Sequence, residues 1–211
     1  MPNTAYNLLS GKSLERLAAL SDGVFAVAMT LLVLDLHTPA AEAVHSEADL
    51  QSALLKLAPR LLAYMMSFLT LGIFWHGQQT QLNYLTEGDR NLGWIQLVFL
   101  FAVTLLPFTT ALLAEFITYR SALLLYWGNI LLLGLVLLVS WRYARRAGLV
   151  RNENVPDNLD QLLQGRILVA QLMYAIGAAL CLYSTYLSIG VIVLVQLNYA
   201  VAPRGGRLLR Y

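Results

Sequence analysis

The sequence predicts an all-α membrane protein with six transmembrane helices, and its composition and block pattern lead to this fold class. Of 211 residues, 58% are hydrophobic and 12% are charged, about half the roughly 25% that is typical of soluble domains. The apolar residues fall mostly in blocks of about 20, the length of helix that crosses a bilayer. Because no period-two alternation of a barrel strand is present, we expect helices.

Six apolar blocks mark the expected spans, at residues 17–36, 57–75, 92–113, 122–141, 167–186 and 187–202. The last two blocks adjoin, and residues 183–186 are expected to hold the turn between them. The first block carries Asp22 and follows directly on Arg16, a pattern that a cleaved signal peptide would lack, so we expect it to be retained. The longest polar stretch, 142–165, is too short for a separate domain. We therefore expect a single membrane domain over residues 1–211.

The orientation follows from the distribution of Lys and Arg. With six spans, both termini share one side of the membrane with the second–third and fourth–fifth loops. Eleven basic residues lie on that side: Lys12, Arg16, Arg90, Arg142, Arg145, Arg146, Arg151, Arg166, Arg204, Arg207 and Arg210. Three lie on the other side: Lys56, Arg60 and Arg120. This asymmetry predicts that both termini lie in the cytoplasm. We expect the protein in the plasma membrane.

The first helix is the most polar span, and polar residues inside a membrane are candidates for function. Arg16, Ser21 and Asp22 lie in its first half. We expect them to form a structural polar network with Trp75, His76 and Gln96 of the second and third helices. Gly23 belongs to the same region, because a small residue allows another helix to approach closely.

One stripe of the first helix contains Gly23, Val27, Thr30, Leu31 and Leu34, which recur at three- and four-residue spacing. By composition this stripe fits either a packing seam between helices or the lining of a pore. On composition alone, such a stripe is more often a packing seam than a pore lining.

Other classes of function have less support. Ser21, Asp22 and His76 are the residue types of a hydrolytic triad, but adjacent side chains diverge by about 100° around a helix, and no catalytic or metal-binding motif is present. We expect no enzymatic activity, no metal site and no cofactor. A net charge of +2 without a basic, aromatic-rich patch argues against a nucleic-acid partner. A coupled transporter with Asp22 and His76 as relay groups remains the alternative.

The first helix, from Arg16 through Leu20-Ser21-Asp22-Gly23 to Asp35, resembles the signature helix of the transmembrane protein 175 family of potassium channels. The family motif has Phe where this chain has Leu20. The third-helix stretch 97–113 and the Phe74-Trp75 pair also resemble the family. In the family a histidine follows this tryptophan a few residues later, where this chain has Gln78 and Gln79.

The resemblance implies a homotetramer of six-helix subunits with the first helices around a central pore, in a membrane and permeable to monovalent cations. It implies a hydrophobic constriction at Val27, Leu31 and Leu34, with Thr30 beside the ion path. The family usually has a bulkier residue than Val27. The Thr-Val-Gly-Tyr-Gly carbonyl filter of ordinary potassium channels is absent, and apolar rings gate by excluding water. We therefore expect only modest selectivity for K⁺ over Na⁺, with K⁺ as the permeant ion.

Overall fold

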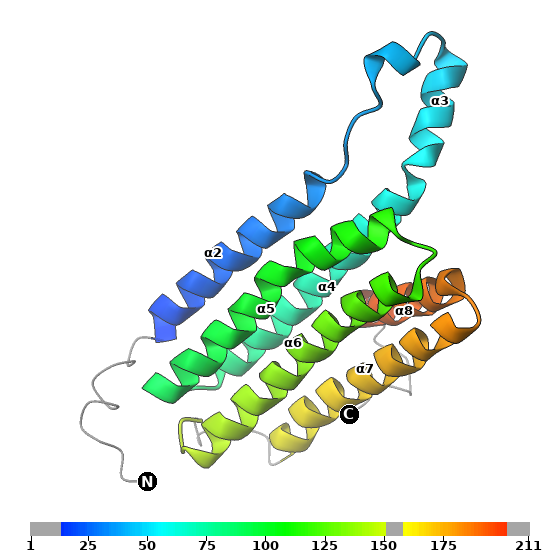
Figure 1. Ribbon diagram of the computed structural model, residues 1–211. Coiled ribbons are helices and arrows are strands. Elements are labelled where there is room, and N and C mark those ends of the chain that lie inside the picture. The colour runs from blue at the N-terminus through cyan, green and yellow to red at the C-terminus, as the bar shows by residue number, and fades with distance from the viewer. Residues whose placement is uncertain (1–13, 151–157, 202–211) are drawn as a thin grey trace.

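The computed structural model describes residues 14–150 and 158–201, and it is a bundle of long helices (Figure 1). Its elements are α2 (Leu14–Val33), η1 (Ala41–Ala43), α3 (Glu47–Lys56), α4 (Ala58–Asn83), α5 (Arg90–Glu115), α6 (Arg120–Arg146), α7 (Leu159–Ala179), η2 (Leu180–Leu182) and α8 (Thr185–Val201). We call the end where α2, α5 and α7 begin the proximal end. The opposite end, beyond which α3 projects, is the distal end.

The structure confirms the predicted fold class. Within the described ranges, five helices are long and apolar enough to cross a membrane, and the sixth, α8, is a shorter apolar helix. The predicted turn between the last two spans lies at Tyr183 and Ser184. The protein is therefore a multi-pass membrane protein.

Two predicted boundaries were wrong by about two turns. The second span does not end at Trp75, because α4 continues to Asn83, and the fifth begins at Leu159 instead of Ile167. Both added segments are rich in glutamine, which lowers the local hydropathy. Gln78 and Gln81 of α4 are nevertheless buried in the bundle.

Aromatic packing holds the first helix against its neighbours. The Phe99 ring of α5 lies 6.1 Å from that of Phe25 on α2 and 6.4 Å from that of Phe74 on α4, both tilted. Tilted aromatic pairs at this separation are attractive beyond the area that they bury. All three side chains are buried, so α2 has one face fixed on α4 and α5.

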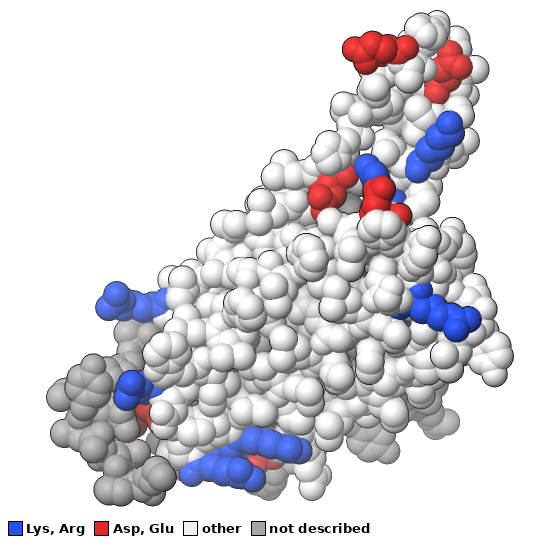
Figure 2. Space-filling view, in the orientation of Figure 1, with Lys and Arg blue, Asp and Glu red and all other residues white. Residues whose placement is uncertain are grey.

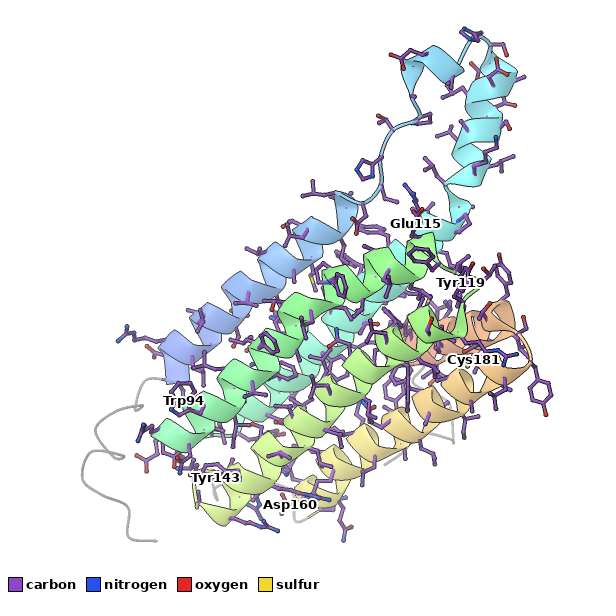
Figure 3. All side chains as sticks on the ribbon, in the orientation of Figure 1. Trp94, Glu115, Tyr119, Tyr143, Asp160 and Cys181 are labelled. Atoms are coloured by element: carbon purple, nitrogen blue, oxygen red, sulfur yellow. The ribbon has the colours of Figure 1, made fainter. Side chains whose placement is uncertain are left out.

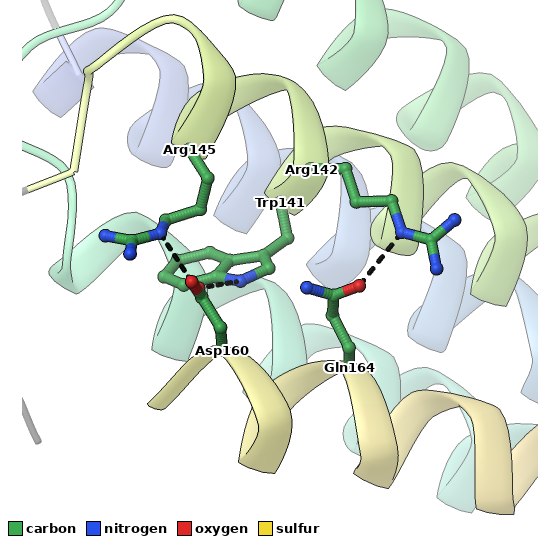
Figure 4. Close-up of polar contacts among 5 residues, drawn as sticks. All are labelled: Trp141, Arg142, Arg145, Asp160 and Gln164. Carbon is green, nitrogen blue, oxygen red and sulfur yellow. Dashed lines mark hydrogen bonds and ion pairs between the residues drawn. The ribbon is translucent and has the colours of Figure 1, made fainter. Parts of the chain in front are cut away.

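The proximal end is fastened by charged and polar contacts between α6 and α7 (Figure 4). Asp160 accepts hydrogen bonds from Trp141 Nε1 at 3.0 Å and Arg145 Nε at 2.8 Å. Arg142 Nε donates to Gln164 Oε1 at 2.9 Å. These contacts join the last turns of α6 to the first turns of α7.

The surface matches a protein that crosses a bilayer. Figure 2 shows charged atoms gathered toward the two ends, with a broad uncharged band between them. Trp94 and Tyr143 lie toward the proximal end and Tyr119 toward the distal end (Figure 3), as expected for aromatic side chains at membrane interfaces. The described basic residues divide as the sequence analysis expects: Arg16, Arg90, Arg142, Arg145, Arg146 and Arg166 on the proximal side, and Lys56, Arg60 and Arg120 on the distal side. Lys12, Arg151, Arg204, Arg207 and Arg210 lie outside the described residues.

Candidate functional site on the first helix

Helix α2 has one buried face and one face that its own chain leaves uncovered. Ser21, Phe25, Ala28 and Leu32 are buried against α4 and α5. On the uncovered face, Val27 is 58% exposed, Leu31 45% and Leu34 66%. The predicted stripe therefore lies outside the packing seam of the single subunit.

A shallow groove of about 400 Å³ runs along this uncovered face. It lies between α2 and α5, and its lining is almost entirely small or apolar: Ala19, Leu20, Gly23, Val24, Val27, Ala28, Leu31 and Thr104. A Cβ placed on Gly23 would have no atom of the chain within 4 Å. Within one subunit, Gly23 therefore permits no close helix approach, and the space beside it is open.

On this face, Thr30 lies within α2, whereas Leu34 lies just beyond its end. The exposed Thr30 hydroxyl donates to the backbone oxygen of Val27 at 2.8 Å, so its proton is used within the helix and its lone pairs are left outward. Leu34 lies just past the last helical residue, Val33, and its backbone N–H donates to Leu31 O at 3.1 Å. The first span is thus slightly shorter at this end than the predicted 17–36.

Behind the uncovered face, a chain of buried hydrogen bonds joins four helices. Gln78 Nε2 of α4 donates to Ser21 Oγ of α2 at 3.0 Å and to Gln96 Oε1 of α5 at 2.7 Å. Gln96 Nε2 then donates to Ser140 Oγ of α6 at 2.8 Å. The Ser21 hydroxyl donates to Leu17 O at 2.9 Å. This Gln78 cluster, made of Ser21, Gln78, Gln96 and Ser140, supplies polar partners between helices where water is excluded.

A second contact fixes the acidic residue of the first helix. Asp22 Oδ1 accepts a hydrogen bond from Trp75 Nε1 at 2.8 Å and another from Gln79 Nε2 at 2.7 Å. Hydrogen bonds to a charged group are stronger than neutral ones. The Asp22 carboxylate therefore ties α2 to α4 beside the Gln78 cluster.

The structure brings together some residues of the predicted network and separates others. Ser21 and Gln96 meet through Gln78, and Asp22 meets Trp75. His76 does not join them: it lines a cavity against α6, α7 and α8, because one residue along a helix turns the side chain by about 100°. Arg16 is exposed in the first turns of α2.

Sequence reasoning missed three members of these contacts, Gln78, Gln79 and Ser140. The signal was available in part, since Gln78 and Gln79 stand at i+3 and i+4 from Trp75, on the same helix face as that residue. The expectation that the second helix ends at Trp75 hid this relation. Ser140 lies on the fourth helix, for which the sequence offered no pairing signal.

Fold and site together define a class of protein: a six-helix membrane protein whose first helix is anchored on one side by polar contacts and presents uncovered apolar side chains on the other. Residues 16–107 match the family model described as the endosomal/lysosomal potassium channel TMEM175. A potassium channel of Chamaesiphon minutus is 30% identical over 189 residues, covering 88% of this chain and 93% of the relative. One of Streptomyces collinus is 30% identical over 188 residues, covering 87% and 90%. The chain belongs to the TMEM175 family.

A solved structure supports the same assignment. It is described as a lysosomal potassium-selective channel TMEM175 homolog from Chamaesiphon minutus, and it superposes with a TM-score of 0.76 at 28% identity. The similarity covers 91% of this chain and 98% of that chain. The endosomal/lysosomal proton channel TMEM175 of Gallus gallus is 35% identical over 109 residues, which cover 49% of this chain and 22% of the relative.

Proposed function

We propose that this protein is a potassium-permeable cation channel with modest selectivity for K⁺ over Na⁺. The observation that carries the proposal is the uncovered apolar stripe of α2, on a helix that packs against α4 and α5 through Ser21, Phe25, Ala28 and Leu32. Full-length relatives named as potassium channels support the same function. The proposal needs K⁺ as the permeant ion and no cofactor.

The pore of this proposal requires several copies of the chain, since one α2 helix cannot enclose an ion path. Four subunits around a cyclic axis would place four copies of Val27, Leu31 and Leu34 in stacked apolar rings. Such rings resist ion passage by excluding water. The outward lone pairs of the Thr30 hydroxyls would offer oxygen atoms to a cation near the constriction. The groove beside Gly23 would receive a neighbouring subunit.

The proposed orientation places the proximal end in the cytoplasm of a cell with this protein in its plasma membrane. The excess of Arg on the proximal side supports it. The distal end, with Glu42, Glu47 and Asp49 near its tip, would then face outward. Lipids would contact the apolar faces of the outer helices.

The geometry favours a channel over a coupled transporter with Asp22 and His76 as relay groups. The Asp22 carboxylate is held by Trp75 and Gln79, whereas His76 faces the cavity between α4 and the last three helices. A relay needs its two groups on one path. Here they lie on different sides of α4.

The decisive experiment measures K⁺ and Na⁺ flux into liposomes that contain the purified protein, with no proton gradient. We expect Leu31→Asn to raise K⁺ flux several-fold and to reduce K⁺ preference, because a polar ring hydrates the constriction. The matched control is Val33→Ala, about 200° around the helix from Leu31, which should leave flux nearly unchanged. Wild-type flux in Leu31→Asn, together with altered selectivity in Val33→Ala, would show that another face of α2 lines the path.

A further inference from the structure

The cavity that His76 lines lies between α4, α6, α7 and α8, and no residue of α2 borders it. Its volume is about 80 Å³. A water molecule occupies about 30 Å³ in the liquid, so the cavity holds only a short part of a larger molecule. His76 of α4 and Arg166 of α7 both line it, and both are exposed. The cavity is therefore open to the surroundings of the subunit at these two side chains.

The two exposed side chains lie at one depth, near the proximal surface of the membrane. Arg166 stands seven residues after the start of α7, and His76 seven residues before the end of α4. At 1.5 Å per residue, each is about 10 Å from the proximal end of its helix. Side chains of a helix tilt toward its N-terminus, which for α7 is the proximal end. The long stem of Arg166 can therefore carry its guanidinium to the level of the lipid headgroups.

The charge of Arg166 is not neutralised by an acidic side chain among the described residues. None of the ion pairs that these residues form includes it, and no Asp or Glu belongs to the described lining of the cavity. Its Cζ lies 5.7 Å from the centre of the Tyr199 ring, a separation at which an aromatic ring attracts a cation. The ring thus holds the guanidinium at the cavity, and the positive charge stays available to an anion.

The cavity changes from cationic to apolar along the membrane normal. Ala170 stands one turn deeper than Arg166 on α7, and Ile73 about one turn deeper than His76 on α4. Other apolar residues of the wall are Leu137 and Ile167. A phospholipid has the same order of groups, with a phosphate at the headgroup level and methylene groups below it.

From this arrangement we propose that the cavity binds an anionic phospholipid of the proximal leaflet, at a site separate from the ion path. Arg166 donates parallel N–H bonds to the phosphate, His76 donates one more, and the first methylene groups of one acyl chain contact Ile73 and Ala170. Water or free phosphate would leave the apolar wall uncovered. A zwitterionic headgroup brings a cationic group, for which the described lining offers no carboxylate.

The test is native mass spectrometry of the full-length protein in detergent with equal amounts of dioleoyl-phosphatidylglycerol and dioleoyl-phosphatidylcholine. We expect the wild type to retain phosphatidylglycerol in preference. Arg166→Gln should weaken this retention about fivefold, whereas Arg166→Lys, which keeps the charge, should preserve the preference. The matched control is Arg146→Gln, at an exposed arginine of the same side that does not line the cavity, and it should retain phosphatidylglycerol as the wild type does.

A second pair of variants tests the apolar half of the site. Ala170→Leu fills the wall and should weaken retention with the charge intact, whereas Ala179→Leu, at an exposed position of the same helix, should not. If Ala170→Leu does not fold, the Arg166 variants still decide the matter.

Equal retention of the two lipids by the wild type would overturn the proposal. Equal losses in Arg166→Gln and Arg146→Gln would do the same, because they would assign the effect to general surface charge. Displacement of the lipid by inorganic phosphate at the same concentration would indicate a phosphate site without a role for the acyl chain, and it too would overturn the proposal. None of these outcomes bears on K⁺ flux, so failure here is distinguishable from failure of the channel proposal.

Discussion

Gln78 of α4 forms hydrogen bonds with two neighbouring helices. Its amide nitrogen donates both to Ser21 of α2 and to Gln96 of α5, and the side chain is completely buried. Between membrane helices, such hydrogen bonds contribute about 0.6–2 kcal/mol each. The cluster thus matters less for its total energy than for the relative rotation that it imposes on α2, α4 and α5.

This arrangement predicts strong coupling between two substitutions. Gln78→Met or Gln96→Met alone should destabilise the protein by about 1–3 kcal/mol, because each leaves a buried polar partner without its bond. The double variant should cost clearly less than the sum of the two, because the pair becomes an apolar contact of similar shape. Thermal unfolding of the purified protein in one detergent measures all three variants. Additive losses would show that the two amides do not act as a pair.

Asp22 illustrates how far the sequence leads at this scale. The motif and the cost of a carboxylate inside a span identified it as a network residue, and the structure gives it two donors, Trp75 and Gln79. Trp75 was predicted and Gln79 was not. A single sequence shows that a buried polar group needs a partner, but the choice between neighbours depends on helix rotation, which tertiary packing sets.

At the scale of elements, hydrophobicity alone predicts the number of helices but not where they end. The strongly apolar α5 and α6 were predicted within a few residues at nearly every boundary. The ends that failed are the last turns of α4, where Gln78 and Gln81 are paired inside the bundle, and the first turns of α7, where Gln164 accepts a hydrogen bond from Arg142 near the surface. A hydrophobicity scale assigns each side chain the free energy of moving it from water to lipid. It therefore counts a glutamine as unfavourable even where the amide is hydrogen-bonded to another helix.

The short helix α3 carries a prediction about pH. The Ser46 hydroxyl donates to Asp49 Oδ2 at 2.8 Å and the His45 backbone N–H donates to it at 3.2 Å. These bonds, that of Ser46 first, lower the pKa of the Asp49 carboxyl below its ordinary value of 3.8. Ser46 is the N-cap residue of α3. Because the folded-state pKa of Asp49 is depressed, the stabilisation of α3 by these hydrogen bonds is fully present above pH 3.8 and is lost as the pH falls through the lower folded pKa.

The measurement is the ¹³C chemical shift of the labelled Asp49 carboxyl during a pH titration. We expect its midpoint to lie below 3.8 in the wild type and to return toward the ordinary value in Ser46→Ala. A wild-type midpoint at or above that of the Ser46→Ala variant would contradict the geometry of this cap.

For the whole molecule, the division of charge between the two ends predicts its direction in the membrane. A cysteine in place of Ser46, near the distal tip, should react with a membrane-impermeant thiol reagent in intact cells. A cysteine in place of Glu87, an exposed residue between α4 and α5 at the proximal end, should react only after the membrane is opened. The native Cys181 is buried, so it contributes little background. The reverse pattern of labelling would invert the proposed orientation.

The uncovered groove between α2 and α5 predicts assembly. We expect four chains per particle by native mass measurement in mild detergent. Gly23→Trp should shift the particles to smaller assemblies, because the side chain fills the space that a second copy would occupy. Val139→Trp, at an exposed position of α6, is the control and should leave the mass unchanged. Monomers in the wild type would remove the basis for a pore on the subunit axis.

The polar second half of α4 also has a consequence for biosynthesis. With a mean hydropathy of 1.2, against 2.3 for α5 and 2.4 for α6, α4 is the weakest candidate among the long helices for stable insertion on its own. Ser21 and Asp22 of α2, which accept from Gln78 and Gln79, are already present when α4 is made. Gln96, which also accepts from Gln78, and the Leu137 carbonyl, which accepts from Gln81, are synthesised after it. We expect the nascent α4 to stay near the translocon, or to shift in depth, until α5 and α6 emerge and supply these remaining partners. The order of synthesis thus makes insertion of this helix a late, cooperative event instead of an independent one.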